Sequence, residues 1–95
     1  MSERLRAYFG EGDWKITTTF DFLAKKEEPV HIAEIAKHLT EKCGRHIHYI
    51  EAESAVKYLK SKGLVEAGKE KYEPVITKKG LKIYKLLEEV GKQLT

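Results

Sequence analysis

Cysteine and long apolar runs are scarce in this sequence, and each scarcity limits what the protein can be. Cys43 is the single cysteine, so no disulfide can form within the chain. This fits a reducing compartment, and we expect a cytoplasmic protein. No uncharged run approaches the roughly 20 residues that a membrane-spanning helix requires. The charged residues at the start are followed by no apolar segment, so we expect no signal peptide.

Asparagine is absent and glutamine occurs once, at Gln93, whereas lysine and glutamate dominate the charged residues. Because this bias is common in proteins from hot environments, a thermophilic source is a working hypothesis. The composition, 41% apolar and 35% charged, is that of one globular domain. A chain of 95 residues buries only a modest core, so association with a second copy would stabilise it.

Motifs for catalysis are also missing. The sequence has no Gly-rich phosphate loop, no Gly-x-Ser-x-Gly elbow, and no paired histidines flanking a glutamate at helical spacing. We therefore expect neither enzyme activity nor a cofactor.

Four potential metal ligands lie close together in the sequence: His38, Cys43, His46 and His48. Zinc and copper favour such ligands, so a metal-sensing site is one hypothesis. However, the spacing matches no closed zinc-finger pattern, and Cys43 continues the apolar face of a predicted helix. We therefore interpret Cys43 as a small buried hydrophobe and predict no metal site.

The net charge of +3 is unevenly distributed along the chain. Residues 1–48 balance 8 basic against 8 acidic residues, whereas residues 57–85 contain nine lysines and three glutamates. A basic cluster of this kind is the electrostatic footprint of a polyanionic partner. The alternative is an ordinary solvated surface rich in lysine.

The first quarter of the chain predicts a short helical stretch over residues 2–9 and a helix from Asp13 to about Lys26. Asp13 is a good N-cap, and Pro29 helps to end the helix because the residue before a proline avoids helical geometry. The threonines at 17–19 are mediocre helix formers, so packing must hold this segment together.

A pair of helices is predicted next. Apolar residues recur at i, i+3, i+4 and i+7 over residues 32–39, which indicates an amphipathic helix that Gly44 can stop. Residues 45–50 are expected to form a connector, and a third helix to begin near Ala52. Gly63 stands where a left-handed residue would end that helix.

Two short strands are predicted at 64–67 and 71–76, joined by a turn. Pro74 lacks an N–H group, so the second strand should be an edge strand or bulged there. Thr77 can cap a final helix from about Lys78 to Leu94. Its apolar residues repeat in a heptad-like stripe, which we predict to form a dimer interface: Ile83, Leu87, Val90 and Leu94.

The order helix–helix–helix–hairpin–helix, with Lys62-Gly-Leu-Val65 and Thr77-Lys-Lys-Gly80, resembles winged helix-turn-helix transcription regulators. The resemblance is closest to the small MarR-like and PadR-like proteins, including compact ones from archaea and their viruses. It covers residues 13–94 and implies a single domain over residues 1–95, mainly α with a small β-hairpin wing. Residues 13–76 would be the DNA-binding core, and residues 78–94 a C-terminal dimerisation helix.

The resemblance implies a homodimer that binds duplex DNA, with its third helix in the major groove and its wing on the backbone or minor groove. Base edges are distinguishable in the major groove, and basic side chains contact phosphates. The predicted DNA-binding residues are Arg45, His46, His48, Ser54, Lys57, Tyr58, Ser61, Lys69 and Lys71. For each of them, an ordinary solvated side chain is the alternative.

We therefore predict a sequence-specific, DNA-binding transcriptional regulator, such as a repressor that occupies a promoter-proximal site. Glu51 and Glu53 lie near the start of the third helix and would repel phosphates, although a helix N-terminus tolerates them. This keeps open an alternative function, a winged-helix protein-interaction module of a transcription or replication assembly. A third alternative is a repressor gated by a small-molecule effector or a metal, which no motif in the sequence supports.

Overall fold

The computed structural model describes residues 14–94, with their side chains up to Glu89. This part of the chain forms a mainly helical fold with one antiparallel hairpin, as predicted. Its elements are α2 (Trp14–Lys26), α3 (Ile32–Cys43), α4 (Tyr49–Ser61), β1 (Val65–Ala67), β2 (Pro74–Ile76) and α5 (Lys78–Leu94). The predicted helical stretch at 2–9 and the N-cap Asp13 lie outside the described residues.

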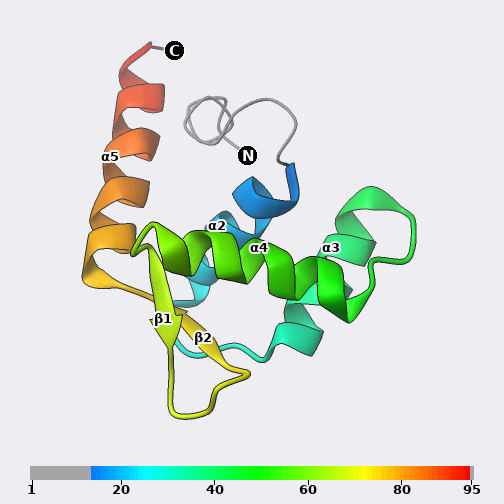
Figure 1. Cartoon of the computed structure of the whole chain (residues 1–95). Helices are drawn as coiled ribbons and strands as arrows, with labels where there is room; N and C mark the ends of the chain where they lie inside the picture. Colours follow the sequence, from blue (N-terminus) through cyan, green and yellow to red (C-terminus); the bar gives the residue numbers. More distant parts are fainter. Residues whose placement is uncertain (1–13, 95) are drawn as a thin grey trace.

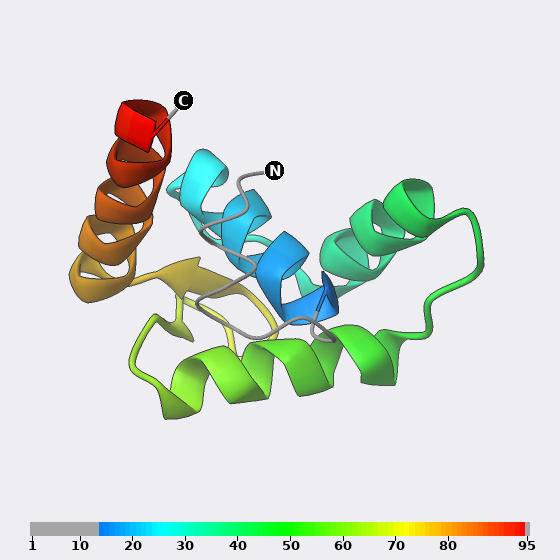
Figure 2. The ribbon, with the colours of Figure 1, turned by 90° about the horizontal axis from the view of Figure 1, so that it is seen from above.

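Helix α2 is the centre of the fold and contacts each of the other three helices named above. Figure 2 shows α2 between α5 and α3, with α4 running across them. In Figure 1 the hairpin projects from the α4 side of the molecule, and α5 stands at one edge. Among residues 14–94, no helix combines the length and apolar character that crossing a membrane requires.

Packing holds α2 together, as the sequence predicted. Phe20 and Leu23 are fully buried, and Thr17, Thr18 and Thr19 are buried beside them. Threonine has a lower helix propensity than an unbranched residue, so local preference alone would not sustain this helix. Burial of its apolar side chains against α3, α4 and β2 supplies the stabilisation that propensity does not.

Helix α3 begins and ends where the sequence predicted. His31 is its N-cap, and Nδ1 of the imidazole accepts a 3.0 Å hydrogen bond from the Ala33 amide. At the other end Gly44 adopts a left-handed conformation with φ of 79°, and its amide donates to the Thr40 carbonyl. A glycine adopts this conformation without a Cβ penalty, so Gly44 ends the helix cleanly.

Helix α4 begins at Tyr49, three residues earlier than predicted, so residues 49 and 50 do not belong to the connector. The cause is a capping interaction, in which Oε2 of Glu51 accepts a 2.9 Å hydrogen bond from the His48 amide. A glutamate three residues after the N-cap stabilises the first turn by satisfying a free backbone donor. The signal was present as His48-x-x-Glu51, but histidine is not a usual N-cap residue.

The end of α4 confirms the predicted stop at Gly63. This glycine has φ of 73°, the Leu64 amide donates to the Leu59 carbonyl, and the Gly63 amide donates to the Lys60 carbonyl. These two bonds define a Schellman motif. Leu59 and Leu64 are both fully buried, so the apolar contact that accompanies this motif joins α4 to the start of the hairpin.

The two strands pair antiparallel, with Val65 opposite Ile76 and Ala67 opposite Pro74. Both are shorter than predicted. Leu64 belongs to the stop of α4, and residues 71–73 belong to the turn, where the Glu73 amide donates to the Glu70 carbonyl. The hairpin therefore has a longer turn and a shorter ladder than the pattern of alternating residues indicated.

Pro74 lies on the outer edge of the sheet, as its missing N–H group predicted, but that edge is not free. The carbonyls of Pro74 and Tyr72 accept hydrogen bonds from the amides of Val30 and Ile32 at 3.0 and 2.9 Å. This contact needs only the carbonyl of Pro74, so proline is tolerated there. The segment before α3 thereby fastens the hairpin to the helices.

Cys43 is exposed, which corrects its interpretation as a buried hydrophobe. Its Sγ atom lies 3.6 Å from the Arg45 carbonyl, to which it donates a weak hydrogen bond. The buried face of α3 ends one turn earlier, at Leu39, because the chain turns away at Gly44. Ile47, 1% exposed, covers the core instead.

Helix α5 has the predicted bounds and the predicted cap, since Oγ1 of Thr77 accepts a 2.9 Å hydrogen bond from the Gly80 amide. Ile83 and Leu87, two members of the predicted dimer stripe, are half-buried against this domain's own core. The other two members, Val90 and Leu94, lie beyond the described side chains. Leu86, which was not predicted, is 52% exposed.

Candidate nucleic-acid interface

Helix α4 has one buried and one exposed face. The buried residues are Ala52, Ala55, Val56 and Leu59. The opposite face carries an exposed line of residues at i, i+4, i+7 and i+11, which we call the outer stripe: Ile50, Ser54, Lys57 and Ser61. Residues at this spacing lie one above another along a helix, so the outer stripe presents one continuous surface.

The structure leaves all nine predicted DNA-binding residues exposed. Ser54, Lys57 and Ser61 lie within the outer stripe, and Tyr58 lies beside it with Nζ of Lys62 5.5 Å from its ring centroid. Exposure is necessary for a DNA contact, but each assignment stays a prediction.

Ile50, the first residue of the outer stripe, was not predicted from the sequence as a contact residue. It is 67% exposed, the highest value among the exposed large apolar residues of the described chain. Because the helix was predicted to begin at Ala52, Ile50 was assigned to the connector. Extending the predicted helix back to the His-x-x-Glu spacing at 48–51 would have placed Ile50 one turn before Ser54.

The two serines of the outer stripe use their hydroxyl hydrogens within the helix. Oγ of Ser54 donates to the Ile50 carbonyl at 2.9 Å, and Oγ of Ser61 donates to the Tyr58 carbonyl at 2.6 Å. A hydroxyl oxygen that donates in this way keeps lone pairs that can accept hydrogen bonds. In this arrangement both serines present acceptors to a partner, while Lys57 presents a cation.

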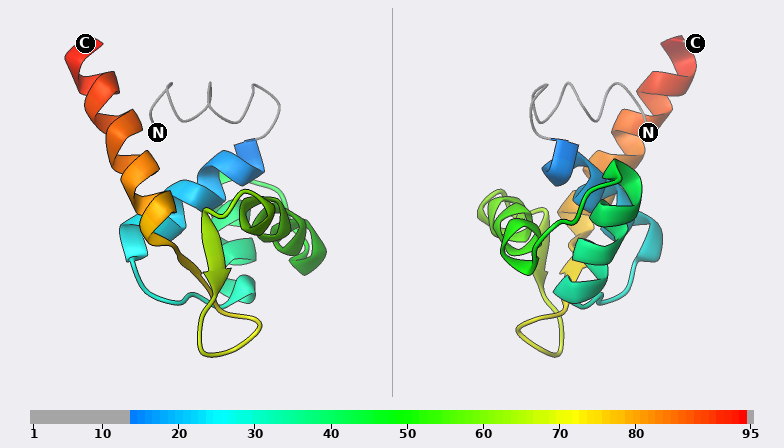
Figure 3. Two further views of the ribbon diagram at one scale, coloured as in Figure 1. Left: turned by 60° about the vertical axis from the view of Figure 1, so that its left-hand side comes forward. Right: turned by 90° about the vertical axis from the view of Figure 1, so that its right-hand side faces the viewer.

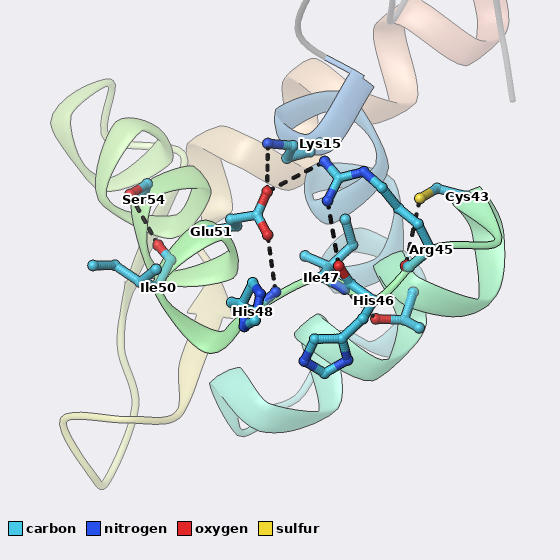
Figure 4. Close-up of polar contacts among 10 residues, drawn as sticks. Lys15, Cys43, Arg45, His46, Ile47, His48, Ile50, Glu51 and Ser54 are labelled. Carbon is cyan, nitrogen blue, oxygen red and sulfur yellow. Dashed lines mark hydrogen bonds and ion pairs between the residues drawn. The ribbon is translucent and has the colours of Figure 1, made fainter.

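Glu51 is directed away from the outer stripe and toward α2 (Figure 4). Its Oε1 atom lies 3.0 Å from Nζ of Lys15 and 3.4 Å from Nη2 of Arg45. The His48 amide, followed by the two cations, lowers the pKa of Glu51 from 4.5 to about 2. The carboxylate is thus charged at neutral pH but balanced, so its repulsion of a nearby phosphate is reduced.

The connector before α4 is fixed at its middle and exposed on both sides. Ile47 is buried, and its amide donates a 2.9 Å hydrogen bond to Oγ1 of Thr40 on α3. His46 and His48, on either side, are exposed with their ring centroids 4.6 Å apart. Arg45 also donates to the His46 carbonyl, so part of its hydrogen-bonding capacity is used within the connector.

Of the four potential metal ligands, His46 and His48 lie close together, but His38 and Cys43 have other partners. His38 stacks on Phe22 with ring centroids 4.1 Å apart, whereas Cys43 contacts the Arg45 carbonyl. Within residues 14–94, no group of three or more His, Cys, Asp or Glu side chains could hold a metal ion.

The turn of the hairpin projects beyond the helices on the side of α4 (Figure 3). Lys69 and Lys71 are exposed on this turn. Tyr72 at its end stacks on His31 with ring centroids 6.2 Å apart, and His31 lies edge-on to Tyr49 at 6.5 Å. These three rings connect the turn to the beginnings of α3 and α4, so the hairpin lysines and the outer stripe belong to one structural unit.

Comparison of this chain with protein family models, with curated proteins and with solved structures finds no match.

Proposed function

We propose that this protein is a winged helix-turn-helix regulator of transcription that binds duplex DNA as a homodimer in the cytoplasm. In this proposal α3, the connector and α4 form the helix-turn-helix, α4 is the recognition helix and the hairpin is the wing. The observation that carries the proposal is the outer stripe of α4, which is exposed along its whole length and serves no purpose in the core.

The dimensions of the outer stripe suit the major groove. An α-helix with its side chains is about 10–12 Å in diameter, and the major groove is about 12 Å wide, so α4 can enter it. The outer stripe would then present about 16 Å of helix to the base edges. Ser54 and Ser61 present hydrogen-bond acceptors and Lys57 presents a donor, so the stripe can discriminate between base edges.

The charges around the outer stripe support phosphate binding. Lys57 lies within it, and Lys69 and Lys71 lie on the turn of the hairpin that is connected to α4. Arg45 and the two exposed histidines precede the helix. Because Lys15 and Arg45 balance Glu51, the main objection to a DNA partner is weaker than the sequence alone indicated. Glu53 remains beside the stripe, where it can accept a hydrogen bond from cytosine.

In the proposed dimer, α5 of one protomer packs against α5 of the other. Leu86 is 52% exposed and extends the predicted stripe onto the outer surface of the helix. A two-fold dimer of this class would place its two recognition helices about 34 Å apart, one turn of DNA.

The test is a fluorescence-anisotropy titration with random-sequence duplex DNA at two salt concentrations. Wild type is compared with Lys57→Ala, Lys69→Ala, and with Lys25→Ala, Lys26→Ala, a matched control on the far end of α2. Each phosphate contact contributes about 0.9 to the slope of log affinity against log salt, so the first variant should lower the slope by roughly 2 per protomer. Absence of binding at low salt would favour the protein-interaction module instead.

A further inference from the structure

Ile50 is an apolar side chain that the fold does not use. It lies on the exposed face of α4, opposite the buried residues, and remains 67% exposed. Its neighbour Tyr49 approaches His31, in the ring cluster that connects to the hairpin. Ile50 does not belong to this ring cluster. We therefore attribute the exposed isoleucine in the first turn of α4 to contact with a binding partner.

We infer that Ile50 contacts the 5-methyl group of thymine in the major groove; this inference rests on the proposed DNA-binding function. The N-terminal residues of a recognition helix contact base edges, and Ile50 is the second residue of α4. The thymine methyl is the one apolar group that the four standard bases present in that groove. An isoleucine placed against any other base edge would remove polar groups from water without replacing their hydrogen bonds.

Ser54, one turn further along the outer stripe, is compatible with the same type of base pair. Its hydroxyl donates to the Ile50 carbonyl, so its oxygen remains available to accept a hydrogen bond. In the major groove adenine presents its N6 amino group as a donor, and cytosine presents its N4 amino group. Among these groups, only the thymine methyl is confined to A·T pairs. Ile50 would therefore select the A·T pair, and Ser54 would accept a hydrogen bond from adenine or cytosine at a neighbouring position.

The test removes single methyl groups from the DNA. A preferred duplex is first selected from a random pool, and each thymine in it is then replaced in turn by deoxyuridine, which pairs identically but lacks the methyl group. Binding is measured for wild type, Ile50→Ala and Ile50→Val, with Lys25→Ala as a control. Because Ile50 is exposed, the variants should retain the wild-type circular dichroism spectrum and melting temperature.

At one or two thymines in each half-site, replacement should weaken wild-type binding about fourfold, the effect of losing one buried methyl group. Ile50→Ala should bind thymine and deoxyuridine duplexes equally at those positions, whereas Ile50→Val should keep most of the discrimination. Lys25→Ala should discriminate as wild type does.

Four results would overturn the inference. If wild type binds DNA but no deoxyuridine replacement weakens binding, or if Ile50→Ala keeps the full thymine preference, Ile50 does not contact a thymine methyl and the proposed function stands. If selection enriches no sequence, DNA binding is non-specific and Ile50 has no role in selecting a base. If wild type binds no duplex at low salt, the proposed function fails as well.

Discussion

The hydroxyl group of Tyr84 on α5 donates a 2.7 Å hydrogen bond to Oδ1 of Asp21 on α2. The ring of Tyr84 also lies edge-on to Phe20, with centroids 5.7 Å apart. Burial, followed by this hydrogen bond to a carboxylate, raises the pKa of Tyr84 well above its ordinary value. Tyr84 thus contributes both a hydrogen bond and a ring contact to the packing of the proposed dimerisation helix on the centre of the fold.

Tyr84→Phe should lower the free energy of unfolding by about 1–2 kcal/mol, because it removes a hydrogen bond to a charged group while keeping the ring contact. Urea denaturation measures this change. Tyr72→Phe, which alters an exposed ring on the hairpin, is the control and should change stability by less than about 0.5 kcal/mol. Equal effects of the two substitutions would show that the bond to Asp21 contributes little.

Gly80→Ala should destabilise the protein, although alanine usually stabilises a helix relative to glycine. A Cβ atom at this position would collide with the Leu64 carbonyl oxygen and crowd the Ile76 side chain. Forcing α5 away from the hairpin should cost about 1–3 kcal/mol. The comparison is Lys82→Ala, on an exposed position of the same helix, which should be neutral in thermal denaturation. A variant at Gly80 with wild-type stability would contradict the close approach of α5 to Leu64.

Glu51→Gln should lower the melting temperature at neutral pH, because it weakens the cap of α4 and removes the ion pairs to Lys15 and Arg45. The pKa of Glu51 is about 2 in the folded protein and 4.5 ordinarily, so the carboxylate stabilises the fold above pH 4.5. That stabilisation is lost as the pH falls from 4.5 toward 2. The difference in melting temperature between wild type and variant should shrink over this interval, and a constant difference would reject the mechanism.

The imidazole of His38 should make stability depend on pH below about 6.5. Burial, followed by the charge of Lys42, lowers the pKa of His38 below 6.5, while Glu41 and Asp21 oppose this shift. A lowered histidine pKa favours the neutral form in the fold, so its contribution is complete above pH 6.5 and is lost on acidification through the lower folded pKa. Between pH 7 and pH 5, the free energy of unfolding should fall less for the His38→Gln variant than for wild type, as measured by urea denaturation. Since His31 is present in both proteins, a difference between them isolates His38.

Leu86→Glu should convert the proposed dimer into a monomer without unfolding the domain. Leu86 is half-exposed, whereas Leu87 also packs against the protein's own core, so a charge at Leu86 is the cleaner probe. Sedimentation equilibrium measures the mass, and DNA affinity should fall by roughly 100-fold because the two half-sites no longer bind together. A variant that remains dimeric would exclude Leu86 from the interface.

Features that depend on local sequence were predicted well. The bounds of α3 and α5 and the stop at Gly63 follow from apolar periodicity, from Thr77 as a cap, and from glycines that adopt a left-handed conformation. The same periodicity identified the exposed side of α4, so Ser54, Lys57 and Ser61 were placed on the surface correctly.

Other features were decided only by tertiary structure. Glu51 both caps α4 and pairs with Lys15, 36 residues away, and the exposed position of Ile50 follows from where this helix begins. Cys43 continues the apolar pattern of α3, but Ile47 occupies the adjacent core because the chain turns at Gly44. Sequence periodicity determines which side of a helix is apolar. Contacts between segments far apart in the chain determine where a helix begins and which residue fills the space beside it.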